Sequence, residues 1–196
     1  RTSTLFPYTT LFRSGMERVK LYNASGHAEK KGVGAYARVI QQSLPNLPCE
    51  EEGRLNDPVL RENFVNRVFA YRRWQSLRAM GFSAAGLVDF HSRHKYMVMV
   101  HSQAAYRRLG RLFSHLKGID LEAVADAYEA EFMAALKRRA GRKRHVNALQ
   151  HIQGYLKQRI DGGDKQELAE SIEAYRREEV PLIVPVRLLQ HYFRRN

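Results

Sequence analysis

The spacing of apolar residues predicts that most of the chain is helical. From residue 57 onward, apolar side chains recur every three or four positions, as on the buried face of an amphipathic helix. Asp57 followed by Pro58 predicts a helix start, because Asp caps the first backbone N–H groups and Pro fits the first helical position. Ser83 and Ser102 are further candidate caps. The helices predicted in this way cover residues 57–81, 83–101, 102–113, 121–139, 142–160, 164–177 (with Asp164 and Glu167 as the start signal) and 185–193. We therefore expect a mainly α protein, with a helical bundle of about six or seven helices over residues 57–196.

The residues before 57 have a mixed pattern. Val19 and Leu21 alternate with charged neighbours, which is typical of a β-strand, and the glycine-containing stretch 26–34 predicts a loop. Residues 33–43 then follow a short helical pattern. Because one strand and one helix cannot bury a core, we expect residues 15–56 to be the carboxy-terminal remnant of an α/β domain.

The first fourteen residues have a different origin from the rest. Residues 4–14 (TLFPYTTLFRS) match, residue for residue, the translation of a common sequencing-adapter oligonucleotide. We expect residues 1–14 to be an adapter-derived artefact without ordered structure, and they do not enter the fold prediction. An open reading frame that begins inside a sequencing read also implies that the natural protein continues upstream, so we expect a metagenomic fragment.

The chain is strongly basic, and the charge is uneven. Its 196 residues include 33 Lys and Arg against 20 Asp and Glu, a formal net charge of +13. Residues 15–56 hold six basic and five acidic residues, whereas residues 57–196 hold 25 and 15, a net of +10. Such an excess favours a polyanionic partner, with nucleic acid ahead of an acidic membrane surface. No apolar run approaches the roughly 20 residues needed to span a bilayer, so we expect no membrane partner.

Cysteine usage limits the chemistry available to this chain. The single cysteine, Cys49, cannot form an internal disulfide and cannot by itself hold a zinc ion or an iron–sulfur cluster. We interpret Cys49 as a small apolar residue of the interior. We expect a cytoplasmic protein.

The densest positive charge lies between two predicted helices. Six of the eight residues 137–144 are basic, namely Lys137, Arg138, Arg139, Arg142, Lys143 and Arg144. A junction of this kind is exposed, and Gly141 lets the backbone approach a phosphate closely. The alternative is a solvated, solubilising surface.

Three smaller arginine clusters add to this charge. They are Arg72 and Arg73 beside Trp74, Arg107 and Arg108 near Arg111, and Arg176 and Arg177 beside Tyr175. The neighbouring aromatic rings are candidates for stacking on an unpaired base. Together with the net charge of residues 57–196, these clusters favour a folded RNA such as tRNA over a small metabolite.

Four sequence blocks carry a resemblance to a known family. They are residues 89–95 (DFHSRHK), 101–110 (HSQAAYRRLG), 145–155 (HVNALQHIQGY) and 175–182 (YRREEVPL). In this order they resemble the YbgA-like family of unknown function. Upstream, residues 15–22 (GMERVKLY) and 50–55 (EEEGRL) resemble the carboxy-terminal end of the thiouracil desulfidase family. Chains that join these two domains resemble the RNA 4-thiouridine desulfidases.

The resemblance implies an iron–sulfur enzyme from which the catalytic part is missing. In that family, three cysteines hold a four-iron, four-sulfur cluster that binds the sulfur of the substrate, and they lie before the position of Gly15. Cys49 matches none of them. The full-length parent is then expected to be a desulfidase, and residues 57–196 its RNA-binding accessory domain. This fragment is expected to be inactive, without a catalytic residue or cofactor, and truncated at both ends, because relatives usually continue beyond Asn196.

The polar residues of the family motifs support a competing hypothesis. They are Asp89, His91, Arg93, Lys95, His101, Gln103, Tyr106, His145, Asn147, His151, Gln153 and Tyr155. Histidines and carboxylates on facing helices can form a metal or acid–base site, which would make the helical domain an independent enzyme or a metal-binding domain. Their spacing contains no compact ligand set such as H-E-x-x-H, so no metal ligand is assigned. The favoured interpretation is a polar network between two helices, either structural or lining an RNA-contact groove.

Overall fold

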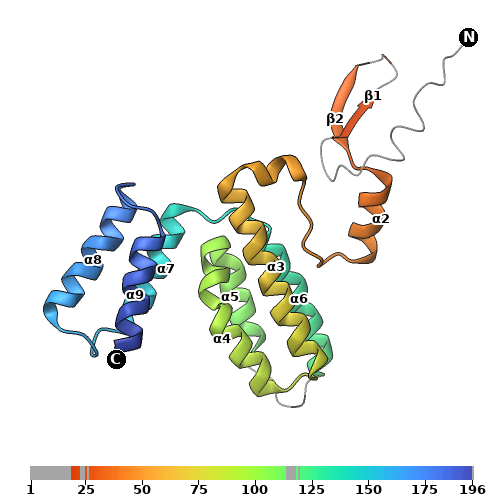
Figure 1. Cartoon of the computed structure of the whole chain (residues 1–196). Coiled ribbons are helices and arrows are strands. Elements are labelled where there is room, and N and C mark those ends of the chain that lie inside the picture. Colours follow the sequence, from red (N-terminus) through yellow and green to blue (C-terminus); the bar gives the residue numbers. More distant parts are fainter. Residues whose placement is uncertain (1–18, 23–24, 26, 114–117, 119, 196) are drawn as a thin grey trace, which may run out of the picture. The chain divides into compact units, whose positions relative to one another are not determined.

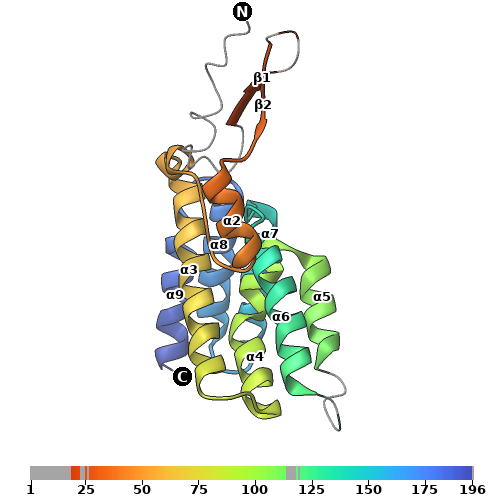
Figure 2. The same ribbon diagram turned by 90° about the vertical axis from the view of Figure 1, so that its right-hand side faces the viewer.

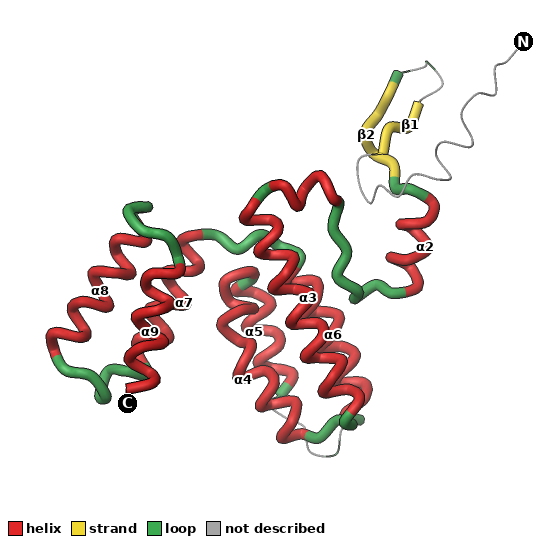
Figure 3. Tube along the Cα trace, in the orientation of Figure 1, coloured by secondary structure: helices red, strands yellow, loops and turns green. Residues whose placement is uncertain are grey.

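The described part of the chain is mainly helical. The computed structural model describes residues 19–195 except 23–24, 26, 114–117 and 119, so the expected artefact at 1–14 lies outside it. Seven α-helices, α3 to α9, lie between residues 57 and 195 of this described part, which confirms the predicted fold class (Figure 3). The chain divides into two compact units, one of Arg1–Gly86 with Ile119–Lys137 and one of Leu87–Gly118 with Arg138–Asn196. They are called unit 1 and unit 2 below.

Unit 1 begins with a hairpin and two short helices. Strand β1 (Val19–Tyr22) pairs antiparallel with β2 (Ala28–Gly32), and α2 (Ala35–Ser43) follows (Figures 1 and 2). A short 3-10 helix, η1 (Glu52–Asn56), leads into the next element. The prediction of a loop over 26–34 is therefore wrong for β2. That strand has the sequence AEKKG, whose low β-propensity is overridden by backbone pairing with β1.

The two long helices of unit 1 lie side by side. They are α3 (Pro58–Ala79) and α6 (Leu121–Leu136) (Figure 1). The Asp57 carboxylate accepts hydrogen bonds from the backbone N–H groups of Val59 and Leu60, as the sequence predicts. Gly81, at φ 82°, reverses the chain after α3, a conformation that glycine adopts without steric cost. Helix α6 ends three residues earlier than predicted.

Aromatic rings form the core between α3 and α6. The ring of Trp74 is fully buried and stacks on Tyr128, with 5.0 Å between centroids, and Tyr128 stacks on Phe132 at 5.5 Å. Phe82 packs against the other side of Trp74 at 5.4 Å. Large buried rings of this kind contribute most of the apolar area that a two-helix contact removes from water.

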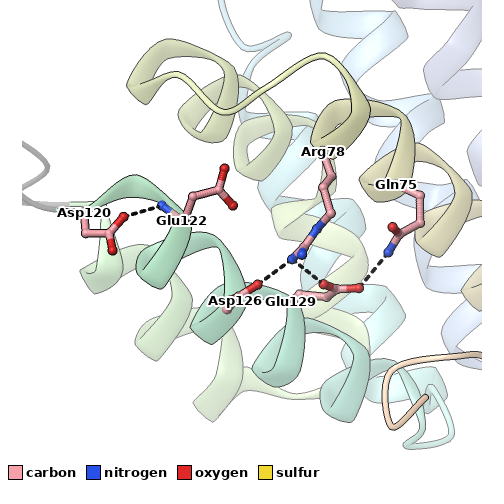
Figure 4. Close-up of polar contacts among 6 residues, drawn as sticks. All are labelled: Gln75, Arg78, Asp120, Glu122, Asp126 and Glu129. Atoms are coloured by element: carbon pink, nitrogen blue, oxygen red, sulfur yellow. Dashed lines mark hydrogen bonds and ion pairs between the residues drawn. The ribbon is translucent and has the colours of Figure 1, made fainter. Parts of the chain in front are cut away.

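A polar network borders this core and is drawn in Figure 4. The buried Glu129 carboxylate accepts hydrogen bonds from Gln75 and from Arg78, both at 2.8 Å. The Arg78 guanidinium also pairs with the exposed Asp126 at 2.6 Å. Asp120 caps α6 by accepting from the N–H of Glu122 at 3.0 Å. Arg78 thus links one buried and one exposed carboxylate of α6 to α3.

Unit 2 contains most of α4 (Ala84–His101), together with α5 (Gln103–Leu112). The Ser83 hydroxyl accepts from the N–H of Gly86 at the start of α4. Ser102 alone separates the two helices, and its hydroxyl accepts from the N–H of Ala105 at 3.2 Å. Both predicted serine caps are therefore confirmed.

The remaining helices of unit 2 share one apolar core. They are α7 (Arg142–Gly154), α8 (Gly162–Arg176) and α9 (Ile183–Arg195), packed around Leu149, Leu168, Tyr192 and their neighbours. Helix α7 ends six residues before the predicted position. Helix α8 begins earlier than predicted, because its cap is the Asp161 carboxylate, which accepts from the N–H of Asp164 at 2.8 Å. No helix among the described residues is long and apolar enough to cross a membrane.

We predict that removing Arg78 destabilises the chain far more than removing its exposed partner. Arg78→Met leaves the Glu129 carboxylate buried with only Gln75 as a partner, at a cost of about 2 kcal/mol in the free energy of unfolding. Asp126→Asn removes an exposed pair and should cost less than about 0.5 kcal/mol. Urea denaturation followed by circular dichroism compares the two variants, and equal losses would contradict this assignment.

Candidate nucleic-acid interface

The positive charge of the chain belongs almost entirely to unit 2. The residues of unit 2 include 19 Lys and Arg against 8 Asp and Glu, a net charge of +11. Those of unit 1 include 14 against 12, a net of +2. We therefore expect a polyanion to be attracted to unit 2 and to contact the surface of that unit.

Four of the eight carboxylates of unit 2 pair with arginines outside its densest basic stretch. They form the ion pairs of Glu173 with Arg176, Glu179 with Arg177, Asp89 with Arg93 and Asp164 with Arg195. These pairs neutralise local charge along α4, α8 and α9. They leave few acidic groups to compensate the residues that join α6 to α7.

The stretch from 137 to 144, called the basic segment here, joins α6 to α7. Lys137 is the last residue of unit 1, and the rest of the segment belongs to unit 2. The side chains of Lys137, Arg138, Arg139, Lys143 and Arg144 are all exposed. Within the described ranges, none of these five forms an ion pair with a carboxylate. Arg144 donates to the backbone carbonyl of Arg139 at 2.8 Å, which curls the segment without neutralising it.

Arg142 differs from the other cations of the segment because it is anchored. Its guanidinium donates to the Tyr175 carbonyl at 2.6 Å, pairs with Glu178 at 3.1 Å and lies 4.6 Å from the centroid of the Tyr175 ring. Glu178 has φ 70°, a left-handed conformation that is costly for a residue with a Cβ. Arg142 therefore fastens the first turn of α7 to the end of α8, a role that the sequence did not distinguish from phosphate binding.

Two motif histidines brace the same region. The Nδ1 atom of His145 lies 2.8 Å from the Tyr175 hydroxyl, and that of His101 lies 2.5 Å from the Arg138 carbonyl. Burial lowers the pKa of His145 to about 4, with further contributions from the charges of His101, Arg142 and Arg144. His145 is thus neutral at physiological pH, and its ring acts as a hydrogen-bonding spacer among the cations.

The two aromatic residues expected to stack on RNA bases are not available. Trp74 has no exposed surface, and Tyr175 is only 5% exposed, with its ring covered by Arg142. The stacking prediction is therefore wrong for both. Their neighbours Arg72 and Arg73 are exposed on α3, in unit 1. Adjacent residues of a helix project about 100° apart, so an arginine can be exposed while the aromatic residue beside it is buried in the core.

Helices α4 and α5 enclose a small hollow that joins two groups of predicted site residues. It has a volume of about 360 Å³ and is lined by His91, Tyr106, Arg107, Gly110 and Arg111. The structure thus brings motif residues together with two of the three arginines of the α5 cluster. Arg108, the third arginine, is exposed but does not line the hollow.

A second cluster links α4 to the end of α7. The Tyr155 hydroxyl accepts hydrogen bonds from Lys95 at 3.1 Å and from Tyr96 at 2.9 Å, and the Tyr155 side chain is half exposed. These two donors lower the pKa of Tyr155, the bond from Tyr96 being the larger cause. The pKa of Tyr96 is raised instead, mainly by burial. Lys95 and Tyr155 came from different motifs, and only the fold places them together.

The other motif residues have separate partners. Asn147 contacts the Met99 sulfur at 3.4 Å, and Gln153 donates to the Lys165 carbonyl at 3.5 Å. The ring of His151 lies 6.2 Å from that of Tyr96, and Gln103 is the first residue of α5. Across the described ranges, no three His, Cys, Asp or Glu side chains come together as metal ligands.

Similarity to known proteins identifies the family. Residues 95–196 match the family described as "Protein of unknown function (DUF1722)", and the chain therefore belongs to it. The chain is also 35% identical over 127 residues to the "Uncharacterized protein YbgA" of Escherichia coli (strain K12), which covers 64% of this chain and 75% of that protein. No solved structure matches the chain significantly. The YbgA-like resemblance is confirmed, and the basic segment lies within the matched region.

We predict that His145 makes the stability of the chain sensitive to acid. Its pKa of about 4 lies below the 6.5 of an unperturbed histidine, so the unfolded chain takes up this proton first as the pH falls. The contribution is fully present above pH 6.5 and is lost between 6.5 and about 4. In His145→Asn this loss should disappear, as thermal melts across that pH range will show. His191→Asn, at an exposed position, is the control, and an unchanged pH dependence in His145→Asn would refute the prediction.

Proposed function

We propose that this chain binds RNA, with tRNA as the expected class, through the basic segment at the start of α7. The observation that carries the proposal is the set of exposed cations in this segment that have no carboxylate partner among the described residues. Cations concentrated in this way repel one another, and the phosphates of a nucleic acid relieve this repulsion by neutralising them. Binding also releases the counterions that were condensed on the nucleic acid. The contacts of Arg142 with Tyr175 and Glu178 fasten the start of α7, which carries Lys143 and Arg144, to the end of α8.

The start of α7 adds a second attraction for phosphate. Gly141 is the N-cap of this helix, and no side chain caps its first N–H groups. An uncapped helix start presents backbone donors and the positive end of the helix dipole to an anion. A phosphate at this position would interact with these donors and with the side chains of Lys143 and Arg144.

We further propose that the parent protein is a cytoplasmic thiouridine or thiouracil desulfidase to which the helical domain delivers RNA. The support is the sequence resemblance of residues 15–22 and 50–55. The residues present here do not fit the iron–sulfur cluster of such an enzyme, because the cluster needs three cysteine thiolates and the sequence has one cysteine, Cys49. This chain is therefore expected to bind RNA without desulfurising it.

We predict a steep salt dependence of tRNA binding that the basic segment controls. For five to seven neutralised phosphates, a plot of log K against log salt should have a slope of about −4 to −6. Replacing Arg138, Arg139, Lys143 and Arg144 by Gln should flatten the slope by about 3 and weaken binding on the order of 100-fold at low salt. Arg142 is kept, because its loss would also release α7 from α8. Fluorescence anisotropy at several salt concentrations measures both quantities.

The matched control removes the same charge elsewhere in unit 2. Replacing Arg93, Arg176, Arg177 and Arg195 by Gln also lowers the net charge by four, but each of these arginines already pairs with a carboxylate. Binding should fall much less in this control. If both variants lose affinity equally, the charge acts as a diffuse field and the basic segment is not the interface.

A second candidate function, acid–base catalysis, is favoured by one observation. The Tyr155 side chain is half exposed, and its oxygen accepts two hydrogen bonds, from Lys95 and Tyr96, which stabilise its ionised form. This geometry suits a phenol that exchanges a proton with a bound molecule. Under the hypothesis of an independent enzyme, Tyr155 and Lys95 would then be the acid–base residues, and no metal ion would be needed.

We predict that one tyrosine of the chain ionises below the ordinary value of 10.0 and that this tyrosine is Tyr155. Lys95→Met should raise its pKa, and Tyr155→Phe should remove the transition from an ultraviolet absorbance titration. Lys157→Met removes a nearby exposed charge without touching the cluster and serves as the control. A titration curve unchanged by Lys95→Met would eliminate Tyr155 as an acid–base group.

A further inference from the structure

The hollow between α4 and α5 has the composition of an anion site. Arg107 and Arg111 are four residues apart on α5, so they project from the same face one turn apart and both line the hollow. Among the described residues that line the hollow, none is Asp or Glu. Two guanidinium groups supply two positive charges and the planar donors that suit phosphate oxygens.

The hollow is also lined by one residue of α4, His91. His91 lies against Phe113, with 5.2 Å between ring centroids. Burial lowers the pKa of His91, helped by the charges of Lys95 and His94, so the imidazole is neutral at pH 7 and offers a flat surface with one donor and one acceptor. Tyr106 adds a hydroxyl from α5.

Gly110 keeps the hollow open. It is an exposed residue inside α5, where glycine lowers helix stability by about 1 kcal/mol relative to alanine. A Cβ at this position would meet only the Nε2 atom of His91, at 3.9 Å, so a larger residue fits without backbone strain. Such a side chain would occupy the space between His91 and the two arginines.

We propose that this hollow binds a phosphate monoester carried by a nucleotide. The two arginines match the dianionic phosphate, and the His91 and Tyr106 side chains face the sugar or base. A volume of about 360 Å³ lies at the small end of ligand sites, which suits a single nucleotide and excludes a folded polymer. The nucleotide is either free or the phosphorylated end of an RNA. The site does not use the basic segment and so goes beyond the proposed function.

The test measures AMP binding by isothermal titration calorimetry and compares three variants with the unmodified chain. Arg107→Gln with Arg111→Gln removes the charge, and Gly110→Leu fills the space while leaving the charge unchanged. Both should weaken AMP binding at least tenfold. Arg108→Gln is the matched control, because it removes one charge from the same helix outside the hollow, and its affinity should stay within twofold. Thermal melts verify that each variant folds.

A second arm distinguishes the two sources of the phosphate. A short RNA is compared with and without a 5′ phosphate, in the unmodified chain and in the variant that lacks the four basic-segment cations. A preference for the phosphorylated RNA that survives in this variant and disappears in Gly110→Leu assigns the site to RNA ends. Binding of AMP without such a preference assigns it to free nucleotides.

The proposal is overturned if AMP does not bind, or if Arg108→Gln weakens binding as much as the double variant. These outcomes are independent of the RNA test. If tRNA fails to bind while AMP binds through Arg107 and Arg111, the nucleotide site stands and the proposed RNA-binding function falls.

Discussion

The arrangement of the basic segment depends on the contact between Arg142 and Tyr175. This guanidinium lies over the ring, donates to the Tyr175 carbonyl and pairs with Glu178. The other cations around it repel one another and would, without this anchor, draw the start of α7 away from α8. Glu178, the carboxylate partner of Arg142, has a left-handed backbone conformation. Its interactions must offset the free-energy cost of that conformation. Arg142 is thus engaged within the protein, and it fixes the start of the helix that carries Lys143 and Arg144.

The same arrangement explains why a neutral histidine occurs among so many cations. His145 hydrogen-bonds to the Tyr175 hydroxyl, and a proton on its ring would add charge to a region that already has an excess. Burial and the neighbouring positive charges keep His145 neutral. His145 therefore serves the scaffold of unit 2 and ties its stability to pH. This is a different role from that of metal ligands, which require several donors directed at one point.

Unit 2 presents two surfaces of different chemistry. The basic segment is exposed and charged and suits an extended phosphate backbone. The hollow of α4 and α5 is lined by two arginines together with His91 and Tyr106, and it suits a single small anion. Unit 1 has almost no net charge, and its polar groups, such as Arg78 and Glu129, are used in contacts between α3 and α6. Because the net positive charge lies on unit 2, we expect anionic partners to bind to that unit.

The sequence by itself determined the helical class, most helix starts and the positions of the cations. These features are local: Asp57, Ser83 and Ser102 cap helices within a few residues of themselves, and apolar spacing follows the helix period. The pattern misplaced the start of α8, because Asp161, a second possible cap, lies three residues before Asp164 and is the residue that caps the helix. The sequence pattern also did not predict the direction of two side chains. Trp74 and Tyr175 were expected to stack on a base, but both are buried in the core.

Only the tertiary structure decided which of the predicted site residues act together. Arg142 and Tyr175 are 33 residues apart, and Lys95 and Tyr155 are 60 apart, so no periodicity within one helix connects them. Arg107 and Arg108 are adjacent and chemically identical, yet only Arg107 lines the hollow, because helix geometry turns successive side chains to different faces. The sequence specifies the charges, but contact between distant helices determines which charges are anchored, which face a cavity and which remain available to a partner.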